Sequence, residues 1–214
     1  MPAQGFWRRF LPLALAALIA WAPGCARKED RGRGGTLIVG EINDYESLNP
    51  MGTTDAHARD VCNLMFLHLL DEQADLLTFG PRLAESWEFS ENRLHLTFHL
   101  RRDVVWTDGA PLTSADVVAT FRAQKDTATA WASRHLKNRI DSVTAADEWT
   151  VVYHFNAVYP YQLMDANDGV IMPKHVIETL SPGEIGTLDV DRLPSNGPFK
   201  LSSWERGQAL TLVR

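Results

Sequence analysis

Cysteine is scarce in this 214-residue chain, which contains only Cys25 and Cys62. Two thiols build neither a disulfide framework nor a four-thiolate zinc site, so both kinds of stapled domain are excluded. Cys62 lies in the apolar stretch Val61–Phe66, which predicts a small buried side chain rather than a reactive thiol. The fold must therefore depend on a hydrophobic core.

Long hydrophobic runs are also scarce. The apolar run Phe10–Ala22 is too short to cross a bilayer, which requires about 20 residues. Arg8 and Arg9 precede this run, and small Gly24 stands directly before Cys25. This order resembles a bacterial lipoprotein signal, in which a peptidase cuts before the cysteine and the thiol then carries lipid. We expect lipidation at Cys25; an ordinary cleaved signal with a coincidental cysteine is the alternative.

Basic residues are in the minority, and the formal net charge is −6. An acidic balance with scattered charges argues against a nucleic-acid partner. An apolar fraction of 45% and a charged fraction of 22% are those of a globular protein. We expect three parts: a signal peptide over 1–24, a charged, Gly-rich flexible tether over 25–35, and a folded lobe over 36–214.

Hydrophobic periodicity predicts short strands interleaved with helices, hence an α+β fold with a mixed sheet. Asp55 is the predicted N-cap of the first helix, and Thr113 or Ser114 that of the second. The strand over 94–100 shows the clearest alternation of apolar and polar residues. The predicted strands are 36–40, 94–100, 140–145, 149–155, 197–201 and 210–213; the predicted helices are 57–70, 113–121, 160–164 and 173–180.

The stretch Leu96–Val118, LTFHLRRDVVWTDGAPLTSADVV, resembles the signature of family-5 extracellular solute-binding proteins. At this position, those proteins have a strand that is followed, at similar spacing, by Leu-Arg, Val, Trp, Asp-Gly, Pro-Leu-Thr and Asp-Val. Most residues of this stretch have structural tasks: Trp106 is an expected core anchor and Gly109 serves a turn. Four shorter matches, at 47–50, 83–87, 172–176 and 196–201, support the resemblance in the family's order.

The resemblance implies the first lobe of a two-lobed, periplasmic-binding-protein type II-like fold. Family members are more than twice as long, so the second lobe is missing from this chain, and residues 210–214 have the character of an interrupted strand. The implied function is a lipid-anchored, periplasmic or extracytoplasmic receptor that delivers peptides or similar small solutes to an ABC permease. The implied activity is binding without catalysis or cofactor. A truncated fragment that binds nothing well is the alternative.

Five residues are candidate ligand contacts. The loop after the first predicted strand carries Tyr45 and Asn49, which offer an aromatic wall and amide groups to an extended peptide. An exposed turn explains the same loop equally well. Tyr161, Asn167 and Asp168 form the second candidate group, for which packing around Pro160 is the alternative interpretation of Tyr161 and of its neighbour Tyr159.

Three histidines form the remaining candidate cluster. His95 and His99 share a face of one predicted strand, and His154 lies on a facing strand. No carboxylate or thiolate accompanies them, so solvated side chains are expected rather than a metal site. A secreted hydrolase is a weaker alternative, because no nucleophile motif or His-Glu-x-x-His metal motif occurs in the chain.

Overall fold

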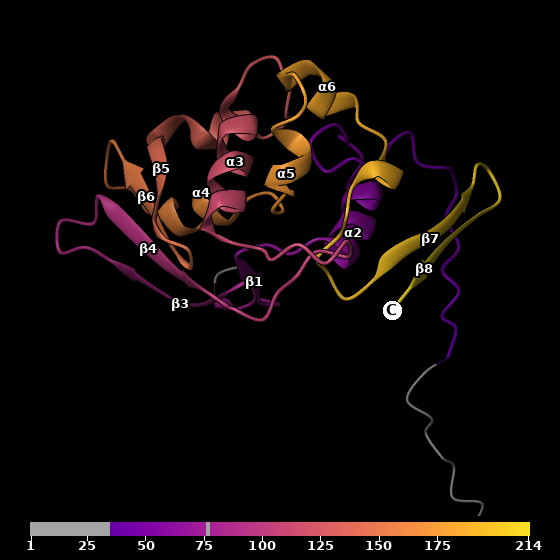
Figure 1. Ribbon diagram of the computed structural model, residues 1–214, viewed down its shortest axis with the longest axis horizontal. Helices are drawn as coiled ribbons and strands as arrows, with labels where there is room; N and C mark the ends of the chain where they lie inside the picture. The colour runs from indigo at the N-terminus through magenta and orange to yellow at the C-terminus, as the bar shows by residue number, and fades with distance from the viewer. Residues whose placement is uncertain (1–34, 76–77) are drawn as a thin grey trace, which may run out of the picture. The chain divides into compact units, whose positions relative to one another are not determined.

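The computed structural model describes residues 35–75 and 78–214 of the chain (Figure 1). Two units separate, Met1–Gly40 and Glu41–Arg214. The predicted signal peptide, Cys25 and all but the last residue of the predicted tether lie outside the described residues.

In the first unit, the predicted strand at 36–40 is wrong. Residues 35–40 carry no regular secondary structure, and the side chains of Leu37 and Ile38 are 87% and 88% exposed. A strand requires a hydrogen-bonded neighbour. Among the described residues, none pairs with this segment, so its apolar character alone does not produce a strand.

A four-stranded antiparallel sheet with the order β3-β4-β6-β5 forms the centre of the second unit. Two small antiparallel sheets, β1-β2 and β7-β8, accompany it. All strand pairs of the described residues are antiparallel, so the predicted mixed sheet is wrong for this part of the chain, because hydrophobic periodicity does not determine strand direction. The strands are β1 Leu70–Glu72, β2 Phe79–Pro81, β3 Ala84–Phe89, β4 His95–Leu100, β5 Ile140–Asp147, β6 Thr150–Phe155, β7 Lys200–Glu205 and β8 Ala209–Val213.

Helices lie on one side of the central sheet, with α3 nearest to β5 and β6 (Figure 1). The helices are α2 Ala56–Met65, α3 Ser114–Lys125, α4 Gln162–Asn167, α5 Lys174–Ile177 and α6 Pro182–Thr187, with short 3-10 turns η1 Arg134–Arg139 and η2 Val190–Arg192.

The interface between α3 and the sheet is the centre of the core. In β4, Leu96, Phe98 and Leu100 are buried and alternate with more exposed residues, as the sequence predicts. The rings of Phe98 and Phe121 both meet Tyr153 edge-on, with centroids 5.4 and 6.3 Å away. Edge-to-face contacts of this kind add to the burial of the rings.

Asp116 joins two helices. One oxygen of its carboxylate accepts hydrogen bonds from the Thr113 backbone N–H and hydroxyl, which closes a capping box at the start of α3. Its other oxygen accepts from the N–H of Lys174 at 2.9 Å, at the start of α5. The predicted cap of α3 is thus confirmed and also positions the segment that leads to α5.

The first helix ends earlier than predicted. Asp55 caps α2 through the N–H of His57, as expected, but the helix stops at Met65. A crossing segment explains this, because the carbonyl of Met65 accepts hydrogen bonds from the N–H groups of Asn196 and Gly197. A Cβ atom at Gly197 would lie 2.6 Å from the Met65 backbone, so only glycine permits this approach.

Cys62 is buried on α2, as the sequence predicts, and is 2% exposed. Its thiol donates to the carbonyl of Leu48 at 3.2 Å. Burial raises the pKa of Cys62 to about 12, so the group stays a neutral thiol at ordinary pH.

Candidate functional site

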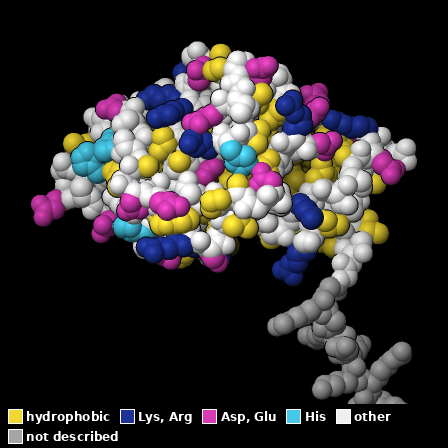
Figure 2. Space-filling model, in the orientation of Figure 1, with side chains coloured by type: hydrophobic (Ala, Val, Ile, Leu, Met, Phe, Trp, Pro, Cys, Tyr) yellow, Lys and Arg dark blue, Asp and Glu magenta, His cyan; other side chains and the backbone are white. Residues whose placement is uncertain are grey.

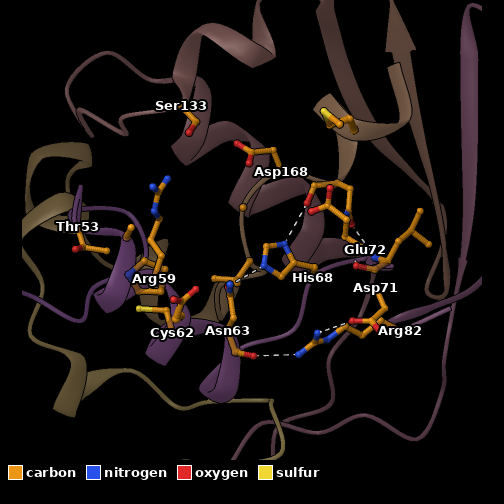
Figure 3. Close-up of a pocket in the computed structure, with 18 of the residues that line it drawn as sticks. Thr53, Arg59, Cys62, Asn63, His68, Asp71, Glu72, Arg82, Ser133 and Asp168 are labelled. Carbon is orange, nitrogen blue, oxygen red and sulfur yellow. Dashed lines mark hydrogen bonds and ion pairs between the residues drawn. The ribbon is translucent and has the colours of Figure 1, made fainter. Parts of the chain in front are cut away.

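A polar cavity of about 460 Å³ opens beside α2, the small β1-β2 sheet and the C-terminal end of α4 (Figure 3). Segments far apart in the sequence contribute to it, from residue 50 to residue 82 and from residue 131 to residue 170. Its chemically informative lining residues are Thr53, Arg59, Asp60, His68, Asp71, Glu72, Arg82, Trp131, Ser133, Asn167 and Asp168.

Asp168 is the most informative of these residues. It follows α4 directly, and Gly169 after it adopts a φ of +87°. The Oδ2 atom of Asp168 is buried and accepts no hydrogen bond from the described residues. A carboxyl group beside a cavity with unused acceptor capacity favours a ligand that brings N–H donors.

A buried lysine lies behind this carboxylate. Lys137 Nζ donates to the backbone carbonyls of Asp165 at 2.5 Å and Asp168 at 2.8 Å. It also lies 5.3 Å from the centre of the Trp131 ring, a cation–π contact. The lysine thereby fixes the turn that presents Asp168 and compensates part of its charge.

The pKa of Lys137 yields a prediction about stability. Burial lowers this pKa to about 8, despite opposing attraction from Asp168 and Asp165, whereas an unfolded lysine titrates near 10.4. Between these values the unfolded chain holds more protons than the folded chain, so folding stability contributed by Lys137 rises with pH. From pH 8 to 10.5 the wild type should gain up to about 3 kcal/mol relative to Lys137→Met.

Urea denaturation of both proteins across this range measures the effect. Taking the difference between them removes the titration of tyrosines and of Cys62, which both chains share. Parallel stability curves for wild type and Lys137→Met would contradict a depressed lysine pKa.

Asn167 lines the cavity, but its side chain is committed to the backbone. Its Oδ1 accepts from the N–H of Leu70 at 2.7 Å, and its Nδ2 donates to the Leu70 carbonyl at 3.3 Å. Its own carbonyl lies 3.2 Å from Nδ1 of His68, whose Nε2 lies 2.9 Å from Oδ1 of Asn63. Burial lowers the pKa of His68, and the ring forms part of the cavity wall.

Two arginines line the cavity, beside the four acidic residues Asp60, Asp71, Glu72 and Asp168. Arg82 is paired with Asp71 at 2.9 Å and donates to the Asn63 carbonyl at 3.0 Å, so its charge is partly compensated. Arg59, on α2, extends its guanidinium along the side of the cavity between Thr53 and Asp168 (Figure 3). The cavity thus presents a carboxylate and a guanidinium to one space, an arrangement suited to a zwitterionic ligand.

The structure brings Asn167 and Asp168 together at the cavity and leaves the other three predicted contacts outside its lining. Asn49 is fully buried and donates to the carbonyls of Ile185 and Leu188, which makes it a structural residue. Tyr161 is 63% exposed at the start of α4.

Tyr45 packs edge-on against Trp204 of β7, with ring centroids 6.4 Å apart. Tyr159, the neighbour for which packing was expected, donates its hydroxyl proton to Asp165 at 2.7 Å and lies under the guanidinium of Arg139.

Arg59, His68 and Arg82 line the cavity but were not predicted from the sequence. Arg59 lies on the polar face of α2, and nothing in its neighbourhood distinguishes it from a solvated surface charge. His68 offered a weak signal, as a polar residue within the apolar stretch that ends at Leu70. Only the fold places these residues opposite Asp168.

The described residues contain neither a metal-binding group of three or more side chains nor a membrane-spanning helix. Over 35–75 and 78–214, His, Cys, Asp and Glu side chains form no group of three or more that could hold a metal ion. Within the same ranges no helix has the length and apolar character needed to cross a membrane.

The fold matches part of the type II-like periplasmic-binding-protein fold. AppA of Bacillus subtilis, solved in complex with a nonapeptide, superposes with a TM-score of 0.78 at 24% identity. The match covers 84% of this chain and 36% of that one. The predicted α+β fold class is therefore confirmed.

Residues 78–214 match the family described as bacterial extracellular solute-binding proteins, family 5. The chain belongs to that family. The probable D,D-dipeptide-binding periplasmic protein DdpA of Escherichia coli is 28% identical over 184 residues, covering 83% of this chain and 35% of DdpA. The periplasmic oligopeptide-binding protein OppA of Salmonella typhimurium is 27% identical over 220 residues, covering 94% of this chain and 39% of OppA. The chain thus spans about a third of the length of the curated relatives it matches.

Proposed function

We propose that this chain forms the first lobe of a substrate-binding lipoprotein that captures peptides or similar small solutes for an ABC importer. The observation that carries the proposal is the polar cavity, with the partly unpartnered Asp168 carboxylate on one side and Arg59 on another. Membership of the solute-binding family supports it, as do relatives whose names describe peptide binding.

In this proposal, the residues of the cavity act by binding alone. Asp168 accepts hydrogen bonds from the ligand's ammonium group, and the guanidinium of Arg59 pairs with a carboxylate. Asn167 contributes indirectly, because its amide fixes the start of β1 beside the cavity. A second lobe closes over the ligand and expels water, which strengthens both charged contacts.

The proposed location is extracytoplasmic. The sequence before the described residues supports this part of the proposal, because Arg8, Arg9, an apolar run and Gly24–Cys25 have the order of a lipoprotein signal. A lipid on Cys25 would tether the lobe to a membrane, near the permease that receives the solute.

Asp168→Asn provides the test of the binding site. Because the proposed first lobe supplies one wall of the cleft, triglycine should bind to it with a dissociation constant far above micromolar. ¹H–¹⁵N NMR titration measures affinities of that order. Asp168→Asn should raise this constant about tenfold, because a charge-assisted hydrogen bond contributes about 1.5–3 kcal/mol. N-acetylation of triglycine should have a similar effect on the wild type and little further effect on the variant.

Asp103→Asn is the matched control, since it removes one carboxylate that is exposed and paired with Arg101. Equal losses in Asp168→Asn and Asp103→Asn would show a general effect of charge and overturn the assignment. Submicromolar binding by this chain would contradict the expectation that a second lobe is needed. Absence of binding at millimolar peptide would favour the alternative of a non-binding fragment.

A further inference from the structure

Two histidines on the outer face of the central sheet form a close pair. His95 of β4 and His154 of β6 lie directly opposite each other in the antiparallel register. Such cross-strand neighbours have Cβ atoms about 4.5–5.5 Å apart. The two Nδ1 atoms are 3.0 Å apart, and the rings meet edge-on with centroids 4.9 Å apart. Figure 2 shows histidine side chains gathered over this end of the sheet.

This geometry requires that one proton be shared between two nitrogen lone pairs. One Nδ1 donates and the other accepts, so at least one ring presents an unprotonated nitrogen to its neighbour. A divalent metal ion can bind between the two Nδ1 atoms once the donor ring changes tautomer and its shared proton moves to its own Nε2, so that each neutral ring carries its proton on Nε2.

The surroundings support that tautomer. Nε2 of His154 lies 2.8 Å from the hydroxyl of Thr144 on β5, which can accept the Nε2 proton and leave Nδ1 free. Metal-bound histidines usually donate their other ring N–H to an oxygen in this way. The exposed His95 ring has solvent available for the same purpose.

We propose that His95 and His154 form a surface site for a divalent transition-metal ion of tetragonal preference, with Cu²⁺ bound most tightly. With metal–nitrogen bonds of about 2.05 Å, donors 3.0 Å apart subtend about 94° at the metal. Square-planar and tetragonal ions accept that angle, and Cu²⁺ binds a given nitrogen site more tightly than the other divalent first-row ions, Zn²⁺ included. Water completes the coordination, and small rotations of the rings direct both lone pairs to one point.

The site is independent of the proposed peptide cavity. His95, Thr144 and His154 are all absent from its lining. His99, the third histidine of the predicted cluster, does not join the pair. It lies 3.9 Å from Glu88 and 3.5 Å from the Thr150 hydroxyl.

Titration of the full chain with CuSO₄, followed by calorimetry and electron paramagnetic resonance, tests the proposal. We expect one Cu²⁺ with nitrogen hyperfine coupling from two imidazoles, and weaker binding of Zn²⁺. His95→Ala and His154→Gln should each weaken Cu²⁺ binding by about tenfold or more, and Thr144→Val should weaken it less. The His95→Ala/His154→Gln double variant should lose the two-nitrogen signal.

His99→Ala is the matched control, because it removes a histidine of the same strand outside the pair. It should change Cu²⁺ affinity less than about twofold. Equal losses in His99→Ala, an unchanged signal in the double variant, or no binding by the wild type would each overturn the proposal. Circular dichroism verifies that these surface variants remain folded.

Discussion

Trp106→Ala should lower the free energy of unfolding by about 3–5 kcal/mol, the range for truncating a buried tryptophan. The Trp106 side chain is 1% exposed, and it is the largest fully buried side chain of the described residues. Its backbone closes the turn at Gly109, whose φ of +90° favours glycine. Alanine would leave a cavity between this turn and the core, and the loss of packing accounts for the cost.

Urea denaturation measures the effect, and two further variants sharpen it. Among the described residues, the buried indole N–H of Trp106 has no hydrogen-bond partner, so Trp106→Phe should cost much less than Trp106→Ala. Val105→Ala is the neighbouring control, because Val105 is 57% exposed. If Trp106→Ala cost no more than Val105→Ala, Trp106 would not be the anchor that its burial indicates.

Asn49→Ala should lower the free energy of unfolding by about 2–4 kcal/mol, because three buried backbone groups would lose their partners. The Asn49 amide donates to the carbonyls of Ile185 at 2.7 Å and Leu188 at 3.0 Å. Its Oδ1 accepts from the N–H of Met51 at 2.9 Å. These bonds join the loop before α2 to the end of α6, across more than 130 residues of sequence.

Thermal and urea unfolding of Asn49→Ala test this structural role, with the exposed Asn43→Ala as control. Asn43→Ala should have little effect on stability. An Asn49→Ala variant that is as stable as Asn43→Ala but binds triglycine more weakly would restore the ligand-contact hypothesis for Asn49.

The elements predicted correctly are those determined by neighbours in the sequence. Alternation in β4 and the cap of α3 at Thr113, which Asp116 completes, each depend on residues a few positions apart. The end of α2 and the absence of a strand at 36–40 depend on distant segments instead. The carbonyl of Met65 is taken by Gly197, and the predicted strand has no partner among the described residues.

The cavity shows the same division. The sequence placed Asp168 beside Asn167 after a short helix, and the structure brings both to the cavity. The sequence could not show that α2 directs Arg59 to the same cavity. Asn49 also illustrates the limit, because an amide suited to a peptide ligand is equally suited to the backbone carbonyls that it contacts.

The most direct test of the central claim is a ¹H–¹⁵N chemical-shift titration of the wild-type chain with triglycine. We expect the largest shifts on backbone amides that line the cavity, above all those of Asp168 and Gly169. Saturable shifts confined to another surface, with the amides of Asp168 and Gly169 unchanged, would contradict the central claim.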